Sequence, residues 1–255
     1  MELNKIYNED CLETMSRMPD NFVDLVVTSP PYDDLRTYNG YSFDFQSIAK
    51  ELFRVVKTGG VVVWVVGDAT IKGSESGTSF KQALYFKEIG FNLHDTMIFE
   101  KNSSTYPANS KSIRYSQIFE YMFIFSKDRP KVVNLISDKK NSWAGHKDFS
   151  GKLKNPVPEF SPRNNIWKYT TSFNDKTLHP AVFPEQLAND HIVSWSNIRD
   201  LIYDPFMGSG TTAKMSILNE RNYIGSEISQ EYCTIAEKRI EETKSLLQSK
   251  PQQLF

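Results

Sequence analysis

One short stretch near the start of the chain, DLVVTSPPY at residues 24–32, limits the possible folds more than any other. Together with Val23, its first part has the length and β-branched composition of a buried parallel strand that ends at Thr28. Pro30 and Pro31 then fix the backbone angle φ and remove two main-chain donors, so the strand ends abruptly in a stiff turn. Open α/β sheets bind ligands just beyond the carboxyl ends of their strands. The stretch therefore predicts an α/β fold with a functional site at this turn.

The chemical groups of the turn suit a planar ring that carries an amino group. The carbonyl oxygens at the prolines and the hydroxyl of Ser29 are acceptors for amino protons, and Tyr32 offers an aromatic face for stacking. A strand that simply ends in a proline turn would show the same pattern, so the motif alone does not decide the function.

Length and cysteine content narrow the class of protein. The chain has 255 residues, of which 39% are hydrophobic, which is enough for one sizeable core or one domain with an insertion. Cys11 and Cys233 form neither a metal-binding spacing nor a disulfide framework, so we expect no metal site and a reducing, cytoplasmic location. The sequence shows no signal-peptide pattern and no run of about 18 apolar residues, so we expect no membrane span.

Charge is distributed unevenly along the chain, although the net charge is only −1. Residues 1–100 contain 15 acidic against 9 basic side chains, whereas residues 127–168 contain 10 basic against 4 acidic ones. Such an asymmetry is typical of a region that faces a polyanion, but a solvated loop would show it too. The ten basic residues are Lys127, Arg129, Lys131, Lys139, Lys140, Lys147, Lys152, Lys154, Arg163 and Lys168.

Strand and helix patterns alternate along most of the chain, which predicts a parallel α/β sheet with right-handed crossovers. The alternation stops at 127–178, where prolines crowd together and no period is sustained. Because so long a structureless stretch is unusual inside a compact domain, we interpret it as an insertion with its own small structure, or one that a partner orders. The expected strands are 5–8, 23–28, 61–66, 91–99, 117–126, 201–204 and 223–227, and the longer expected helices are 11–18, 43–56, 79–89, 211–218 and 231–248.

A second motif, DPFMGSG at residues 204–210, lies between a predicted strand and a predicted helix. Its glycines let the main chain pass close to a ligand, and helix N–H groups are exposed at Thr211 and Thr212. No lysine follows the glycines, so the motif is not a triphosphate cradle. Glu227 ends the next strand about 20 residues further on, the spacing at which an acid binds ribose hydroxyls. These features predict a nucleoside ligand with little phosphate, such as S-adenosylmethionine.

Together, these motifs resemble those of the DNA amino-methyltransferases. The segments that carry the resemblance are TSPPY at 28–32, HPAVFPEQL at 179–187, DPFMGSGTT at 204–212 and YIGSEIS at 223–229. Their order is that of the beta group, in which the catalytic motif precedes the cofactor motif. The resemblance implies a circularly permuted, Rossmann-like sheet of seven strands, with 1–126 and 179–255 as the catalytic and cofactor-binding core. It also implies that 127–178 is a target-recognition insertion.

The resemblance assigns a role to each group of residues. Ser29, Pro30, Pro31 and Tyr32 are implied to hold the target base, and Glu227 the ribose hydroxyls of the cofactor. Asp10 is implied to accept from the adenine amino group, although capping a helix is its alternative role. The implied cofactor-binding residues are Asp10, Cys11, Thr28, His179, Pro180, Asp204, Pro205, Phe206, Gly208, Ser209, Gly210, Thr211, Thr212 and Glu227. The residues expected to contact DNA are Lys111, Arg114, Lys139, Lys140 and Lys147.

The implied activity is a site-specific DNA methyltransferase that uses S-adenosylmethionine and flips its target base out of the duplex. In this family, Ser at the first position of the catalytic motif is similar to the cytosine-N4 enzymes and Asp to the adenine-N6 enzymes, so Ser29 favours cytosine N4. The alternatives are adenine N6 and a catalytically silent DNA-binding subunit. Double-stranded DNA is the expected partner. The sequence leaves open a homodimer and a companion endonuclease of a restriction-modification system.

Overall fold

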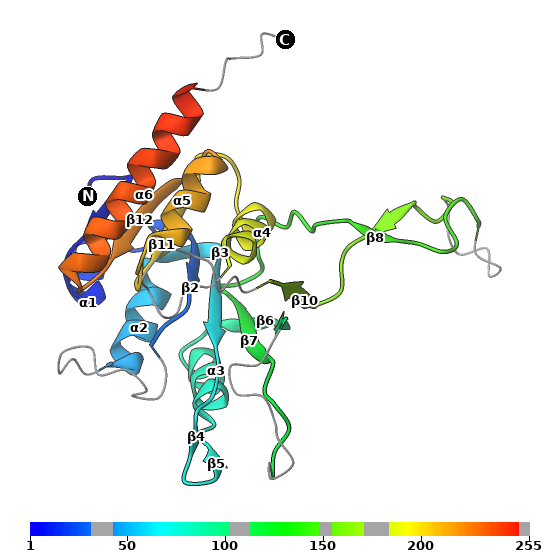
Figure 1. The fold of residues 1–255 in the computed structure, drawn as a ribbon, viewed down its shortest axis with the longest axis horizontal. Coiled ribbons are helices and arrows are strands. Elements are labelled where there is room, and N and C mark those ends of the chain that lie inside the picture. Colours follow the sequence, from blue (N-terminus) through cyan, green and yellow to red (C-terminus); the bar gives the residue numbers. More distant parts are fainter. Residues whose placement is uncertain (32–42, 103–112, 148–154, 171–183, 250–255) are drawn as a thin grey trace.

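The described residues form a central mixed sheet of eight strands, two of which lead into the predicted turns at 29–32 and 204–210 (Figure 1). The computed structural model describes residues 1–31, 43–102, 113–147, 155–170 and 184–249. Across the sheet the strands run in the order β1-β12-β11-β2-β3-β7-β6-β10. Their bounds are β1 Lys5–Tyr7, β2 Val23–Thr28, β3 Val56–Val66, β6 Asn92–Lys101, β7 Phe119–Ser126, β10 Ile166–Tyr169, β11 Leu201–Asp204 and β12 Asn222–Ser226.

Helices cover both faces of this sheet. Successive residues of β2 point to opposite faces, so Val26 packs in one apolar cluster while Leu25 and Val27 pack in another. The Val26 cluster includes side chains of α1, α2 and α3, and α4, α5 and α6 lie on the opposite face. The helices are α1 Cys11–Ser16, α2 Phe45–Val55, α3 Thr78–Glu88, α4 Glu185–Trp195, α5 Thr211–Leu218 and α6 Gln230–Ser249. Within the described parts of the chain, none of the helices has the length and hydropathy needed to span a bilayer.

The sheet is not parallel throughout, which corrects the expectation from the sequence. β7 runs antiparallel to both of its neighbours, β3 and β6. A parallel pair needs a long crossover, usually a helix. The described residues between β6 and β7 contain no helix, so the chain returns beside β6 in the opposite direction.

The seven expected strands are all present, and the eighth comes from the segment interpreted as an insertion. β10 pairs in parallel with β6, with Trp167 opposite Phe99. Trp167 and Tyr169 are buried while Ile166 and Lys168 are exposed, so β10 has the alternation of a half-buried strand. Four residues among scattered prolines are too few for this period to stand out in the sequence.

Most of the remaining described part of 127–178 projects from the body as a two-stranded arm, which we define as residues 138–147 and 155–163 (Figure 1). Its strands are β8 Lys139–Lys140 and β9 Phe160–Ser161, which pair antiparallel. Further main-chain bonds extend the ribbon, including Gly145 N–H to Val157 O at 2.9 Å and Val157 N–H to His146 O at 2.9 Å. A second small ribbon, β4 Thr70–Ile71 with β5 Ser74–Glu75, lies before α3.

The first and the last strand along the chain, β1 and β12, lie side by side in the sheet. β1 pairs in parallel with β12, with Lys5 opposite Ile224, and β12 pairs in parallel with β11. This is the adjacency that the permuted order of motifs predicts, and the permutation itself stays a prediction.

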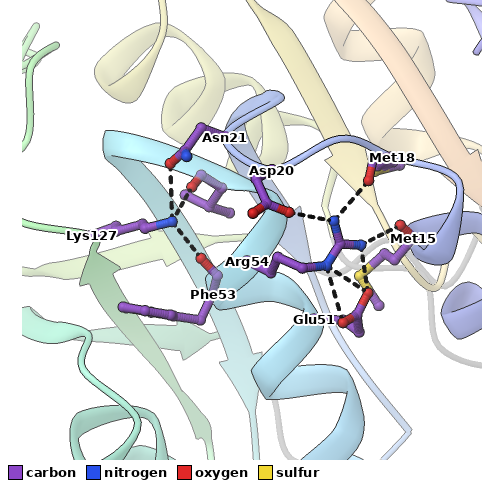
Figure 2. A network of polar contacts seen from close by, with 9 residues as sticks. Met15, Met18, Asp20, Asn21, Glu51, Phe53, Arg54 and Lys127 are labelled. Carbon is purple, nitrogen blue, oxygen red and sulfur yellow. Dashed lines mark hydrogen bonds and ion pairs between the residues drawn. The ribbon is translucent and has the colours of Figure 1, made fainter.

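The start of β2 is held by the partly buried guanidinium of Arg54. Arg54 in α2 donates to the main-chain oxygens of Met15 and Met18 at 2.7 and 2.8 Å (Figure 2). The same guanidinium pairs with Asp20 at 2.9 Å and with Glu51 at 2.6 Å. Arg54 therefore joins α2 to the end of α1 and to the loop that leads into β2, which fixes the strand that carries the SPPY turn.

Candidate functional site

The predicted catalytic and cofactor turns begin side by side, at a shared buried carboxylate. Asp204 at the end of β11 is only 2% exposed. Its Oδ1 accepts from Thr28 Oγ1 at 2.7 Å and from Phe206 N–H at 3.0 Å, and its Oδ2 accepts from Thr212 Oγ1 at 2.7 Å. Thr28 ends β2 and Thr212 lies in the first turn of α5. Asp204 therefore holds the start of the SPPY turn, the cofactor turn and the next helix in one arrangement.

Burial changes the protonation of this carboxylate. Loss of water around Asp204 raises the pKa of its side chain to about 6. Hydrogen bonds from Thr28, Thr212 and the Phe206 N–H oppose that rise, whereas the nearby charge of Glu227 adds to it. Asp204 was expected to line the cofactor pocket; in the structure both of its oxygens are bound by the protein itself.

The cofactor turn needs glycine at two positions. Gly208 and Gly210 have φ of +51° and +85°, a region that other residues rarely adopt. A Cβ on Gly210 would lie 2.9 Å from the Cβ of Ala236 in α6, so the helix packs directly beneath the turn. Pro205 and Thr211 are buried at either end of it.

Glu227 lies directly after β12 and closes the turn from the other side. Its side chain is 8% exposed. Oε2 accepts from Gly208 N–H at 2.8 Å and Oε1 accepts from Ser229 N–H at 2.9 Å. Burial raises the pKa of Glu227, and the main-chain N–H groups of Ser229, Gly208 and Ile228 oppose the rise. Each carboxylate oxygen has two lone pairs, so both keep acceptor capacity for a ligand hydroxyl.

Asp10 and Cys11 lie near Glu227, because β1 runs beside β12. The Asp10 carboxylate accepts from Leu12 N–H at 2.6 Å and caps α1, and its role toward the adenine amino group stays a prediction. Tyr203 Oη in β11 lies 2.8 Å from Ser226 Oγ and 3.5 Å from Cys11 O, so this buried tyrosine joins β11 to the end of β12 and to the first residue of α1.

The catalytic motif is only partly described. Ser29 and Pro31 are partly exposed and Pro30 is buried, directly beyond the end of β2. Tyr32 lies outside the described residues, as do His179, Pro180 and Lys111. Among the described residues, no group of three or more His, Cys, Asp or Glu side chains is arranged to hold a metal ion.

Aromatic rings pack beside the cofactor turn. The ring of Phe206 meets that of Phe43 edge to face at 5.6 Å and that of Trp64 at 6.4 Å between centroids. Trp64 is fixed in turn by a 2.8 Å hydrogen bond from its Nε1 to Gln82. The sequence motifs pointed to Phe206 but not to Phe43 and Trp64 as its neighbours. Phe43 lies just before α2, and Trp64 lies in β3.

The residues expected to contact DNA divide into two places. Lys139, Lys140 and Lys147 are exposed on the arm, and Lys139 donates to Asn164 at 3.0 Å. Arg114 is exposed and donates to the main-chain oxygen of Gly73, between β4 and β5.

Besides Lys139, three of the described basic residues in 127–168 are bound by other groups of the protein. Lys127 donates to Asn21, Phe53 O and Val56 O at 2.7 to 3.0 Å (Figure 2). Lys168 pairs with Glu100 at 2.7 Å. The positive charge of this region therefore overstates the number of cations available to a polyanion.

Arg163 is the third of these residues and fixes the base of the arm. It pairs with Asp138 at 2.5 Å and with Asp190 in α4 at 2.6 Å. Tyr169 Oη also donates to Asp190, at 2.8 Å, and Arg163 lies 5.2 Å from the Trp167 ring centroid. Arg163 thus connects the arm to α4 and β10.

Comparisons with known proteins agree with this architecture. Residues 23–238 match the N6/N4 methyltransferase family model, described as DNA methylase. The orphan methyltransferase M.BamHII of Bacillus amyloliquefaciens is 59% identical over 237 residues, which cover 86% of this chain and 88% of the relative. The solved PvuII DNA methyltransferase (cytosine-N4-specific) has a TM-score of 0.73 at 24% identity and covers 96% of this chain and 91% of its own. The complex of M1.HpyAVI with S-adenosylmethionine has a TM-score of 0.65 at 27% identity, covering 92% and 98%.

Proposed function

The chain belongs to the family of N6/N4 DNA methylases, and from this membership we propose that it methylates the N4 amino group of cytosine in duplex DNA. The family includes both amino-methylating activities, so membership alone supports DNA methylation. Ser29 at the first position of the SPPY motif is the observation that carries the choice of cytosine. Adenine N6 is the second candidate.

The proposed cofactor is S-adenosylmethionine, which M1.HpyAVI holds in its solved complex. The residues of this chain fit it. Glu227 offers acceptor capacity beside the turn, and Gly208 and Gly210 leave the main chain bare where a ligand approaches. We assign the ribose hydroxyls to Glu227 and the adenine amino group to Asp10, whose Oδ1 already caps α1. When bound, the cofactor supplies a methyl group on a positively charged sulfur.

The acceptor of the methyl group needs activation by the protein. The lone pair of an exocyclic amine is delocalised into the ring, so the nitrogen is a poor nucleophile until it becomes more tetrahedral. We propose that the Ser29 hydroxyl and the Pro30 carbonyl accept the two amino protons and favour that geometry. The hydrogen bond between Thr28 and Asp204 fixes the strand end from which both groups extend. Positioning and electrostatics then carry most of the catalysis.

Methylation at carbon 5 of cytosine would require a cysteine thiolate as nucleophile. Cys11 and Cys233 are both buried, and burial raises the pKa of both thiols, to about 11 for Cys233. Neither cysteine adjoins the SPPY turn in sequence. Direct transfer to an amino group is therefore the mechanism that these residues support.

A base inside a duplex is out of reach, so we propose that the target is flipped out and stacks on Tyr32, at a cost of a few kcal/mol. We assign target recognition to the part of 127–178 outside β10, with Lys139, Lys140 and Lys147 on the arm as phosphate contacts. The homodimer and the companion restriction endonuclease stay expectations of the family resemblance; the relative M.BamHII is itself called an orphan methyltransferase.

The decisive experiment identifies the product. The chain is expressed in cells that lack DNA methylation, and their DNA is digested to nucleosides and analysed by mass. N4-methylcytosine is the expected product, and Ser29→Ala should slow the reaction far more than it weakens DNA binding. N6-methyladenine as the sole product would reject the choice of base but keep the mechanism, whereas 5-methylcytosine would reject both. A protein that binds DNA but no S-adenosylmethionine would be the catalytically silent subunit.

A further inference from the structure

An arginine outside all the sequence motifs holds the main chain of the cofactor turn. Arg239 extends from α6 and is 12% exposed. Its Nη1 donates to the carbonyl oxygen of Ser209 at 2.6 Å and to Ser209 Oγ at 2.8 Å. Ser209, which was expected to bind the cofactor, therefore directs its hydroxyl and its carbonyl toward α6.

The peptide unit between Ser209 and Gly210 is held at both ends. Arg239 binds its carbonyl oxygen, and its N–H donates to Met207 O at 2.9 Å. Ala236 lies one helical turn before Arg239, beneath Gly210. The left-handed backbone of Gly210, at φ of +85°, is thus set by α6 from below and by Arg239 from the side.

The second branch of the guanidinium connects the turn to another helix. Arg239 Nη2 donates to Glu185 Oε1 at 2.7 Å, at the first residue of α4. Lys214 in α5 donates to the same oxygen at 2.6 Å. Arg239 and Glu185 together join α4, α5 and α6 behind the turn.

We propose that Arg239 is a positioning residue for cofactor binding, because its fork fixes the Ser209–Gly210 peptide in the conformation that a ligand meets and ties it to α4 through Glu185. This inference rests on the proposed function, since it takes the turn at 204–210 as the S-adenosylmethionine site. It adds a residue of α6 that does not touch the ligand and acts through the main chain. Lysine cannot replace it fully, because one ammonium does not present the same planar pair of branches to Ser209 and Glu185.

The chain offers a matched control. Arg221 donates to Ser196 O at 2.8 Å and to Ser196 Oγ at 3.1 Å, the same pair of groups that Arg239 binds on Ser209. It also donates to Asn219 O at 2.5 Å, so it too joins helix ends. Within the described part of the chain, the hydrogen bonds of Arg221 go to Ser196 and Asn219 and not to the cofactor turn, so its loss should affect stability alone.

The experiment measures S-adenosylmethionine affinity by calorimetry, duplex-DNA affinity, and the melting temperature of the full chain with Arg239→Met, Arg239→Lys or Arg221→Met. Arg239→Met should weaken cofactor binding by about 10- to 100-fold and leave DNA affinity within about twofold. Arg239→Lys should lie between it and wild type. Arg221→Met should lower the melting temperature and keep cofactor affinity.

Two results would overturn the inference: Arg239→Met binding the cofactor as tightly as wild type, or Arg221→Met weakening it as much. If Arg239→Met does not fold, unchanged affinity in Arg239→Lys is the overturning result. Failure of the wild-type chain to bind S-adenosylmethionine would reject the proposed function, and this inference with it.

Discussion

At the cofactor turn, the carboxylates of Asp204 and Glu227 are nearly buried, and every one of their oxygens accepts from a protein donor. On the arm, Lys139, Lys140 and Lys147 are exposed, and the bond to Asn164 is a surface contact. The turn is therefore fixed before any ligand arrives, whereas the cations of the arm are free to adjust to a partner.

The difference fits the two tasks proposed for these regions, methyl transfer at the turn and DNA contact on the arm. Group transfer needs reacting atoms held in place in advance, and a network of buried hydrogen bonds achieves this. Attraction to a phosphate backbone is long-ranged and independent of sequence, so solvated cations on a projecting ribbon suffice. Arg163 combines features of both regions. It belongs to the arm in sequence, but, like the carboxylates of the turn, it is held by partners within the protein.

The largest effect is expected for Asp204→Ala, which leaves the hydroxyls of Thr28 and Thr212 and the N–H of Phe206 without their acceptor. The free energy of unfolding should fall by about 3–5 kcal/mol, measured by urea denaturation. Asp200→Ala is the control at the other end of β11, where the carboxylate caps the exposed Asn197 N–H at 2.7 Å. It should cost about 1 kcal/mol. Equal losses would remove the special role of the buried carboxylate.

Asp204 should also give the turn an unusual pH dependence. Its folded-state pKa is raised to about 6 from 3.8, so the folded chain holds this proton more tightly than the unfolded chain. The contribution of Asp204 to stability therefore falls as pH rises from about 4 to about 6, by about 3 kcal/mol, and is constant above that range. The side chain of Asp204→Asn cannot titrate. The stability of this variant relative to wild type should therefore rise by about 3 kcal/mol between about pH 4 and about pH 6. If the free energies of unfolding of wild type and Asp204→Asn changed equally with pH, the raised pKa of Asp204 would be contradicted.

Arg163→Met is expected to have the next largest effect, because it removes the ion-pair partner of the Asp190 carboxylate, whose side chain is 6% exposed, and leaves it neutral donors such as the Tyr169 hydroxyl. Stability should fall by about 2–4 kcal/mol, and amide hydrogen exchange should quicken in the described parts of the arm. The salt dependence of DNA binding should change little, since this arginine is already bound. A loss of slope as large as that of an exposed lysine would place Arg163 among the phosphate contacts.

Glu227→Ala tests the ligand side of the turn. S-adenosylmethionine binding should weaken by about 1–3 kcal/mol through the loss of charge-assisted hydrogen bonds. The exposed Glu237 of α6 is the control, and Glu237→Ala should bind as wild type. Unchanged affinity in Glu227→Ala, measured by calorimetry, would show that the ribose hydroxyls bind elsewhere.

The smallest effect on folding is expected for Lys139→Gln combined with Lys140→Gln, which should change stability by less than about 0.5 kcal/mol. The slope of log affinity for duplex DNA against log salt should fall by about two units if both lysines contact phosphates. Cofactor affinity should not change. Lys244→Gln, which removes an exposed cation of α6 paired with Glu241, is the control. An unaltered slope in the double variant would show that Lys139 and Lys140 do not contact phosphates.

The local pattern of the sequence determined the elements that carry the motifs. The predicted bounds of β2, β11 and α5 agree with the structure, because the apolar run and the turn residues that bound each element are both visible in the local sequence. The order of motifs identified the family, which the comparisons confirm. The acceptors of the SPPY turn and the glycines of the cofactor turn were likewise visible, since their chemistry belongs to the residues themselves.

The tertiary structure alone decided the direction of the strands, their pairing in the sheet and the partners of the buried charged side chains. The antiparallel course of β7 and the addition of β10 to the sheet depend on contacts between segments far apart in sequence. The same holds for Arg163 and Arg239, whose partners Asp190, Ser209 and Glu185 lie 27 to 54 residues away. A sequence shows that a side chain is charged. Whether the charge meets water or a buried carbonyl depends on the surface that folding brings against it.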